Sequence, residues 1–313
     1  MQVRLKAIAK GMATYVPGIT RFANSVAGTW LGPRYYYAVW LRHLVRVHDV
    51  CGPFKWDVVA ELGPGDALGV GISAILSGVR CYLGLDRIAF ASTEVNLRLL
   101  EDILGLFSAR APIPDQSEFP SVYPTLQNYA FPHHILTSER LSEALEPARI
   151  ERLRALIRAE AKGSPELDFR YVAPWDAAAN VVPRSVDWVL SQAVLEHVDD
   201  VDGVYANLAR WLKPDGVMSH RIDYTCHGIT RDWFGHWTVP AGLWQVTRGR
   251  RAYFINRLPH SAQRAALAHQ GFEILEDEPT LAERSAPLAE IKVTHTPEDL
   301  RIRGAFVVAR RMD

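Results

Sequence analysis

Cysteine is scarce in this sequence, and the three cysteines are far apart. Cys51, Cys81 and Cys226 form no CxxC pair in a chain of 313 residues. Disulfide frameworks and cysteine-based zinc sites use closely spaced pairs or an even set of cysteines. The sequence therefore favours neither, and since it shows no secretory leader we expect a protein of the reducing cytoplasm.

An excess of charge of either sign is also missing. Lys and Arg together number 35, as do Asp and Glu, so the formal net charge is +0. A chain without a basic surplus has no general attraction for phosphate backbones. We therefore expect no nucleic-acid partner, and we interpret the basic segment 248–251 as a solvated loop.

Long hydrophobic runs are absent as well. No run reaches the roughly 18 apolar residues that a membrane-spanning helix requires. The aromatic segment RYYYAVWLRHLVRVH, residues 34–48, is amphipathic. It leaves two interpretations open, a helix packed on its own domain or peripheral contact with a membrane surface.

What the chain does contain is enough apolar material for a sizeable core, since 48% of its residues are hydrophobic. Apolar runs alternate with segments of helical period, which is typical of parallel strands joined by crossover helices. The predicted strands are 57–62, 79–86, 168–173, 186–192 and 217–224, followed by an antiparallel closing pair at 272–278 and 304–310. The predicted helices are at about 67–77, 90–107, 200–212 and 260–270.

This pattern predicts an α/β fold with a seven-stranded Rossmann-like sheet, mostly parallel with an antiparallel last strand. Residues 1–55 are interpreted as an N-terminal helical cap and residues 56–313 as the main domain. Within that domain we predict an insertion at about 108–167. We also predict a substrate loop at about 226–258, where aromatic residues are crowded together.

A glycine-bearing turn follows the first predicted strand, in the segment ELGPGDAL. A dinucleotide fingerprint requires G-x-G-x-x-G, but here Gly63 and Gly65 are followed by Leu68 at the third position. Glu61 would repel a pyrophosphate, yet it suits a ligand that carries ammonium and sulfonium groups. Asp86 ends the second predicted strand, where a carboxylate can accept hydrogen bonds from ribose hydroxyls.

The segments ELGPGD and SVDWVLSQAVLEHVDDVDGVYANLARWLKPDGVMSH together resemble the class I S-adenosylmethionine-dependent methyltransferases. The family pattern runs from an ExGxG turn through an S/F-D strand and a vLEHv segment to an L-K-P-G-G turn, and the resemblance covers about 56–224. Asp215 and Ala67 depart from the usual glycines. The resemblance implies a methyltransferase-type Rossmann fold, with S-adenosylmethionine as methyl donor and S-adenosylhomocysteine as product.

The same resemblance assigns cofactor-binding roles to individual residues. Glu61, Gly63 and Gly65 would face the methionine part, Asp86 the ribose, and Asp176 the adenine amino group, with Trp175 as a flat apolar wall. Ser191 and Gln192 end the fourth predicted strand, at the mouth where open α/β sheets bind ligands. Core packing of Trp175 remains an alternative.

The LEHV segment permits two interpretations. Glu196 and His197 border the cofactor in the family pattern, but His197 is equally well explained as a buried, hydrogen-bonded histidine. A metal role would require further ligands nearby, and the segment alone does not supply them. We therefore predict no metal site.

Methyl transfer to a hydroxyl benefits from alignment of the reactants and from a general base. The candidates His220, Asp223 and His227 lie at and beyond the fifth predicted strand. Period-two geometry places His220 and Asp223 on opposite faces of that strand. We therefore predict His227 as the base, oriented by Asp223, with an ordinary loop histidine as the alternative.

Four residues are predicted to bind the methyl acceptor. Trp233 and Trp237 offer flat apolar rings, while Asn256 and Arg257 offer hydrogen-bond donors to a polar or anionic group. Packing against the N-terminal helices and a surface salt bridge are the alternatives. The segments YVAPWDA, SHRIDYTCH and FINRLPHSAQRAALAHQGFEI resemble a subgroup of bacterial methyltransferases associated with surface-polysaccharide and glycan biosynthesis.

These observations predict an enzyme that transfers a methyl group from S-adenosylmethionine to an oxygen of a sugar, a glycan precursor or another small metabolite. A nicotinamide-dependent oxidoreductase is an alternative, but it would need a glycine at 68 and no acid at 61. A methyltransferase-like binding or scaffold protein without activity is the other alternative.

Overall fold

A central seven-stranded sheet organises the computed structural model, which describes residues 3–16, 31–175, 181–251, 253–287, 291 and 295–312. The strand order is β3-β2-β1-β4-β5-β7-β6. The strands are β1 (Val58–Leu62), β2 (Cys81–Leu85), β3 (Asp168–Val172), β4 (Val186–Gln192), β5 (Leu212–Asp223), β6 (Phe272–Leu281) and β7 (Ile302–Arg311). The neighbours among β1 to β5 pair in parallel, whereas β7 is antiparallel to both β5 and β6. The predicted fold class is confirmed.

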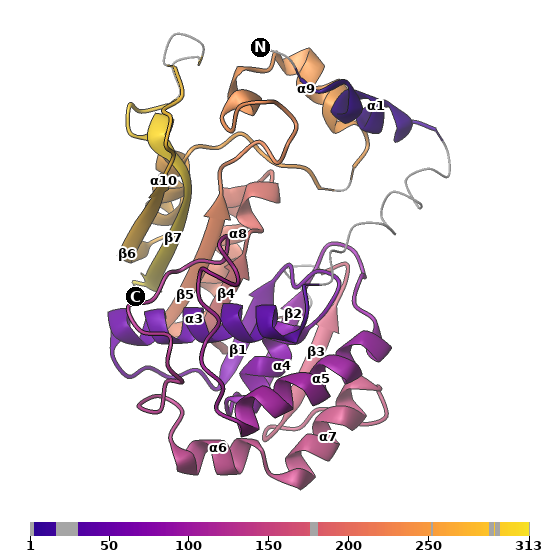
Figure 1. The fold of residues 1–313 in the computed structure, drawn as a ribbon, viewed down its shortest axis with the longest axis vertical. Helices are drawn as coiled ribbons and strands as arrows, with labels where there is room; N and C mark the ends of the chain where they lie inside the picture. The colour runs from indigo at the N-terminus through magenta and orange to yellow at the C-terminus, as the bar shows by residue number, and fades with distance from the viewer. Residues whose placement is uncertain are drawn as a thin grey trace.

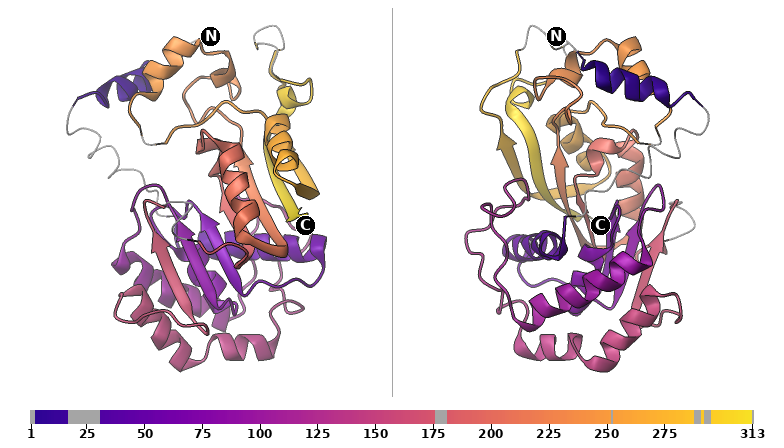
Figure 2. Two further views of the ribbon diagram at one scale, coloured as in Figure 1. Left: turned by 180° about the vertical axis from the view of Figure 1, so that it is seen from behind. Right: turned by 45° about the vertical axis from the view of Figure 1, so that its right-hand side comes forward.

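Helices cover both faces of this sheet (Figures 1 and 2). One face carries α3 (Pro33–Cys51), α4 (Gly69–Leu76), α5 (Thr93–Ser108), α6 (Ser138–Ala144) and α7 (Pro147–Ile157). The other face carries α8 (Val201–Trp211) and α10 (His260–His269). Away from the sheet, α1 (Leu5–Ala13) lies against α9 (Ala241–Arg248). Among the described residues, every helix is too short or too polar to cross a bilayer.

The core has two layers because strand side chains alternate between the two faces of the sheet. Trp188 and Leu190 of β4 pack with the helices of the α3 face, and Val189 between them packs with the α8 face. Strands that are buried on both faces form continuous apolar runs in the sequence. This explains why the strands could be predicted without an alternating pattern.

The predicted N-terminal cap separates into two parts with different roles. Tyr37, Trp40 and Leu41 of α3 are fully buried and belong to the main core. The helix α1, by contrast, packs on α9 in the segment that follows β5, at the top of the molecule in Figure 1 and away from α3. The aromatic segment 34–48 is therefore a helix packed on its own domain.

Two predicted strand boundaries need correction. The strand β5 begins at Leu212 rather than at 217, so it includes the LKPDG turn, and β6 continues to Leu281. Asp215 in that turn has φ 61°, a left-handed conformation that a glycine adopts without strain. Aspartate tolerates this region better than most residues, which is how the turn forms without the family's usual glycine.

Two glycines in helices provide a matched test of core packing. A Cβ atom at Gly71 of α4 would lie 2.3 Å from the Tyr82 ring, whereas at Gly105 of α5 it would meet nothing within 4 Å. We expect Gly71→Ala to lower the free energy of unfolding by about 1–3 kcal/mol because it overpacks the core. Gly105→Ala should raise it by about 0.4–1 kcal/mol through the unfolded state. Urea unfolding measures both free energies, and an equal change in the two variants would contradict the close contact between Gly71 and Tyr82.

Candidate functional site

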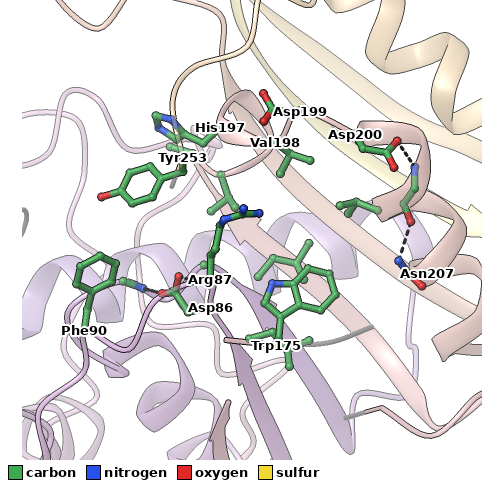
Figure 3. A pocket seen from close by; sticks show the side chains of 18 residues that line it. Asp86, Arg87, Phe90, Trp175, His197, Val198, Asp199, Asp200, Asn207 and Tyr253 are labelled. Carbon is green, nitrogen blue, oxygen red and sulfur yellow. Dashed lines mark hydrogen bonds between the residues drawn. The ribbon is translucent and has the colours of Figure 1, made fainter. Parts of the chain in front are cut away.

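A cavity of about 680 Å³ opens at the carboxyl ends of β1, β2 and β4 (Figure 3). This is the edge at which open α/β sheets bind ligands. Its wall is formed by residues at or after the ends of β1, β2, β3 and β4, by one side of the helix α8 and by Tyr253. The lining residues are Leu62, Gly63, Gly65, Leu85, Asp86, Arg87, Phe90, Trp175, Ala193, Val194, His197, Val198, Asp199, Asp200, Gly203, Val204, Asn207 and Tyr253.

The turn after β1 needs glycine at two positions. Gly63 and Gly65 have φ values of 62° and 76°, in the left-handed region where a side chain is strained. A Cβ atom at Gly63 would also lie 2.7 Å from Val194, while at Gly65 it would meet open space. The backbone at Gly65 therefore borders the cavity without a side chain that would occupy it.

Asp86 follows β2 directly and links the end of that strand to the glycine turn after β1. Its Oδ2 accepts a hydrogen bond from the Gly65 backbone N–H at 3.0 Å, and its Oδ1 accepts one from Arg87 N–H at 2.7 Å. Burial raises the pKa of Asp86, although the bonds from these backbone groups act in the opposite direction. Each carboxylate oxygen has a further lone pair, so the group can still accept hydrogen bonds from a ligand.

Aromatic rings form the apolar walls of the cavity. Trp175 lines it and also packs edge-on against Trp211, with ring centroids 5.4 Å apart, so the side chain contributes both to the wall and to the core. Phe90 and Tyr253 approach each other edge-on at 6.4 Å. Figure 3 shows Trp175 in a different part of the cavity from this pair. Asp176 lies outside the described residues.

Glu61 is directed into the protein rather than into the cavity. It is buried, and it accepts a hydrogen bond from the Tyr82 hydroxyl. Burial raises the pKa of Glu61 to about 8, although the Tyr82 bond opposes this effect. The cavity lining in the described part of the chain does not include Glu61, so its predicted contact with the cofactor's ammonium group stays a prediction.

The structure places three further predicted residues in contacts within the protein, two of them between neighbouring strands and one between the sheet and α3. Ser191 Oγ and His220 Nδ1 are 2.8 Å apart and both residues are buried. Gln192 Oε1 lies 3.1 Å from Nε2 of the buried His43. Burial lowers the pKa of His220 to about 3. Among the described residues the cavity lining includes none of these, so His220 is not positioned as a base toward it.

The two other acid–base candidates do form a pair. His227 Nε2 lies 3.4 Å from Asp223 Oδ2 at the end of β5. Burial lowers the pKa of His227, but the hydrogen bond and the charge of Asp223 outweigh it, so the pKa is raised overall. Burial raises the pKa of Asp223, but the hydrogen bonds to His227 and Thr225 outweigh this effect and lower the pKa to about 2.

The LEHV segment lies between this pair and the cavity. The ring of His197, which lines the cavity, is 5.1 Å from that of His227 and 5.8 Å from that of Tyr253. Burial lowers the pKa of His197 to about 4, and its Nδ1 is buried without a hydrogen-bond partner. Glu196 is 3% exposed, and both of its carboxylate oxygens also lack partners.

The predicted acceptor-binding residues make contacts within the protein. Asn256 Nδ2 donates to the carbonyl oxygens of Leu195 and Val198 at 2.9 and 2.8 Å. Arg257 donates to the Val239 carbonyl oxygen and lies over the Trp244 ring. Trp233 Nε1 donates to the Arg284 carbonyl oxygen, and the Trp237 ring packs against His295. The described cavity lining includes none of the four, so their binding of the acceptor stays a prediction.

Sequence reasoning missed several lining residues, of which Phe90 and Tyr253 are the largest. Phe90 follows β2, so the carboxyl-end rule that identified Asp86 could also have identified this residue. Tyr253 falls within the aromatic segment 226–258, but nothing in its spacing distinguishes it from the packed aromatic residues around it.

Comparison with known proteins supports the interpretation of this region. Residues 150–219, from α7 to β5, match the family model of the methyltransferase domain. This match agrees with the prediction of a methyltransferase domain over these residues, and S-adenosylmethionine is the methyl donor that the prediction names. No protein with a curated description matches the chain at a significant level.

The solved structures that match this chain are only distantly similar to it. An S-adenosylmethionine-dependent methyltransferase from Mesorhizobium loti is 17% identical, with a TM-score of 0.38, over 86% of this chain and 98% of that one. A second from Methanosarcina mazei is 12% identical, with a TM-score of 0.42, over 85% and 97%. Phosphoethanolamine N-methyltransferase 2 from Haemonchus contortus is 14% identical, with a TM-score of 0.47, over 95% and 61%.

Proposed function

We propose that this protein is an S-adenosylmethionine-dependent methyltransferase that methylates an oxygen of a sugar, a glycan precursor or another small polar metabolite. The observation that carries the proposal is the cavity at the carboxyl ends of β1, β2 and β4, where Asp86 joins the glycine turn. The methyltransferase-domain match over residues 150–219 supports the same reaction class.

The residues around the cavity fit a nucleoside cofactor. The Asp86 carboxylate has lone pairs left that can accept hydrogen bonds from a ribose diol. The bare backbone at Gly65 lets a ligand approach closely. Trp175, Phe90 and Tyr253 offer flat surfaces for an adenine ring or a thioether chain.

Methyl transfer from a sulfonium depends mainly on alignment of the acceptor with the methyl group, and it requires no covalent intermediate on the protein. The bound cofactor supplies an electrophilic methyl group on a sulfonium. The chain's own residues hold the nucleoside, exclude water from the apolar part of the cavity and orient the acceptor for in-line attack. The His227–Asp223 pair is the acid–base group beside the cavity, behind His197, and it is suited to removing the proton of an acceptor hydroxyl.

Titration calorimetry with S-adenosylhomocysteine tests the cofactor part of this proposal. We expect the wild-type protein to bind, and we expect Asp86→Ala to weaken binding by about 1–3 kcal/mol, the range for a lost charged hydrogen-bond partner. Asp102→Ala, at an exposed position on α5, is the matched control and should bind like the wild type. Absence of binding to the wild-type protein would refute the proposed function.

A further inference from the structure

A second cluster of polar side chains lies next to the cavity. Glu196 and His197 belong to the short helix η1 (Leu195–His197), and His227 belongs to the loop after β5. One ligand-type atom of each residue lies within 4.8 Å of those of the other two. Since His197 also lines the cavity, the cluster lies at the cavity's edge.

Two residues of this cluster, Glu196 and His197, have buried polar atoms without hydrogen-bond partners. Both carboxylate oxygens of Glu196 and the Nδ1 of His197 are buried and lack a hydrogen bond. Burial of an unpaired polar group costs free energy, and buried carboxylates in proteins are normally paired or bound to a metal. Three such atoms in two neighbouring residues therefore point to a ligand.

The surrounding structure holds the three residues in place. Asn256 holds η1 in place: its side chain donates to the carbonyl oxygens of Leu195 and Val198, and its backbone N–H donates to the Glu196 carbonyl oxygen at 2.6 Å. His227 has φ 47°, an uncommon conformation for a residue with a side chain. Such conformations persist where the surrounding contacts impose them and often mark functional sites.

Asp223 completes an arrangement that metal-binding histidines use. Such histidines usually donate the N–H of one ring nitrogen to a carboxylate, which leaves the other nitrogen for the metal. The His227 Nε2 lies 3.4 Å from Asp223 Oδ2, so Nδ1 of His227 is the nitrogen left for a ligand.

We propose that Glu196, His197 and His227 bind a divalent transition-metal ion such as Zn²⁺ at the edge of the cavity. Two imidazoles and one carboxylate suit Zn²⁺ and its neighbours in the first transition row, whereas Mg²⁺ and Ca²⁺ prefer oxygen ligands alone. Three protein ligands leave a coordination position open, as in catalytic zinc sites. Since His197 lines the cavity, an ion held by these residues would lie beside the space in which a ligand binds.

The catalytic use of this ion rests on the proposed function, although metal binding itself does not. An acceptor hydroxyl that occupies the open position would lose its proton more easily, because a bound divalent ion lowers the pKa of a coordinated oxygen. In this arrangement His227 is a ligand of the ion and not the base, so the bound ion activates the hydroxyl in place of the His227–Asp223 pair and the released proton passes to solvent. The acceptor oxygen then forms a bond to the methyl carbon as the carbon–sulfur bond breaks, and the sulfonium becomes a neutral thioether.

Calorimetric titration of chelator-treated protein with ZnCl₂, without cofactor or acceptor, tests the metal site. The described chain contains one other group with ligand spacing, the more exposed His48, Asp49 and His134. The titration therefore uses a His134→Ala background to remove it. We expect one Zn²⁺ per chain in this background, and absence of binding would overturn the proposal.

Two variants locate the site and a third serves as the control. Glu196→Gln should weaken zinc binding by more than about 100-fold, since loss of a ligand exceeds the 10- to 100-fold loss typical of an outer partner. Asp223→Asn should weaken it by about 10- to 100-fold. Asp202→Asn removes a carboxylate outside the cavity lining that is paired with the exposed His269, and zinc affinity should not change. Thermal unfolding checks that each variant folds, and equal affinity of Glu196→Gln and its parent would overturn the assignment.

Cobalt substitution gives a readout that does not depend on activity. Co²⁺ in a site with three protein ligands is expected to absorb visible light more strongly than Co²⁺ in water, and this absorption should be lost in Glu196→Gln. Failure of zinc binding together with intact S-adenosylhomocysteine binding refutes the metal site alone. Zinc binding without S-adenosylhomocysteine binding refutes the proposed function alone.

Discussion

Replacing His227 with alanine is expected to lower kcat by about 100- to 10,000-fold, the usual contribution of a positioned acid–base group. The acceptor for this assay is first identified by a mass-shift screen of sugar nucleotides, glycans and phenols. The affinity for S-adenosylhomocysteine should not change, because the described cavity lining includes His197 but not His227. Single-turnover kinetics and calorimetry measure the two quantities separately.

The control for this variant is another histidine that is remote from the site. His269 ends α10 and its side chain is 75% exposed, so His269→Ala should leave both kcat and cofactor affinity at wild-type values. An unchanged kcat in His227→Ala would remove His227 from the reaction. A parallel loss of cofactor affinity would instead indicate that the loop after β5 has lost its structure.

The second large effect concerns the pH dependence of stability, through Glu61. Burial raises its pKa in the folded protein to about 8, against an ordinary value of 4.5. Its neutral form therefore stabilises the fold fully below about pH 4.5, and this contribution is lost as the pH rises through about 8. Glutamine mimics the neutral form at every pH, so Glu61→Gln should gain stability relative to the wild type as the pH rises from 5 to 8.

The gain should approach about 1.4 kcal/mol for each pH unit in this window, the free energy equivalent of one unit of pKa shift. Urea unfolding at pH 5, 6, 7 and 8 without cofactor measures it. Glu160→Gln, at an exposed position, should differ from the wild type by less than about 0.5 kcal/mol at every pH. A constant difference between Glu61→Gln and the wild type would show that Glu61 is charged in the folded protein.

Much of the fold could be predicted because its signals are local. Each strand predicted at 57–62, 168–173 and 186–192 matches β1, β3 and β4 within one residue at either end. Strands buried on both faces are apolar along their whole length. The turn at Gly63 and Gly65 and the acid at Asp86 were also identifiable, since one glycine pattern and one strand end define them.

The candidate site was harder to predict because its contacts join distant segments. Asn256 was predicted to bind the acceptor, but its side chain holds residues 58 and 61 positions earlier in the chain. His220 was predicted as a candidate base, but its Nδ1 pairs with Ser191 on the neighbouring strand. The hydrophobic periodicity of either segment does not indicate these hydrogen bonds, because they depend on the order of the strands in the sheet and on how the loops pack.

The amino-acid sequence by itself determined the strands, the crossover helices, the glycine turn and the carboxylate of Asp86, because hydrophobic period and turn chemistry act over a few neighbouring residues. Only the tertiary structure decided which polar groups share a site. It buried His220 and Glu61 in the protein interior, and it brought Glu196 and His197 within reach of His227. The physical reason is that burial and hydrogen-bond partners belong to the folded chain, where segments far apart in sequence pack together.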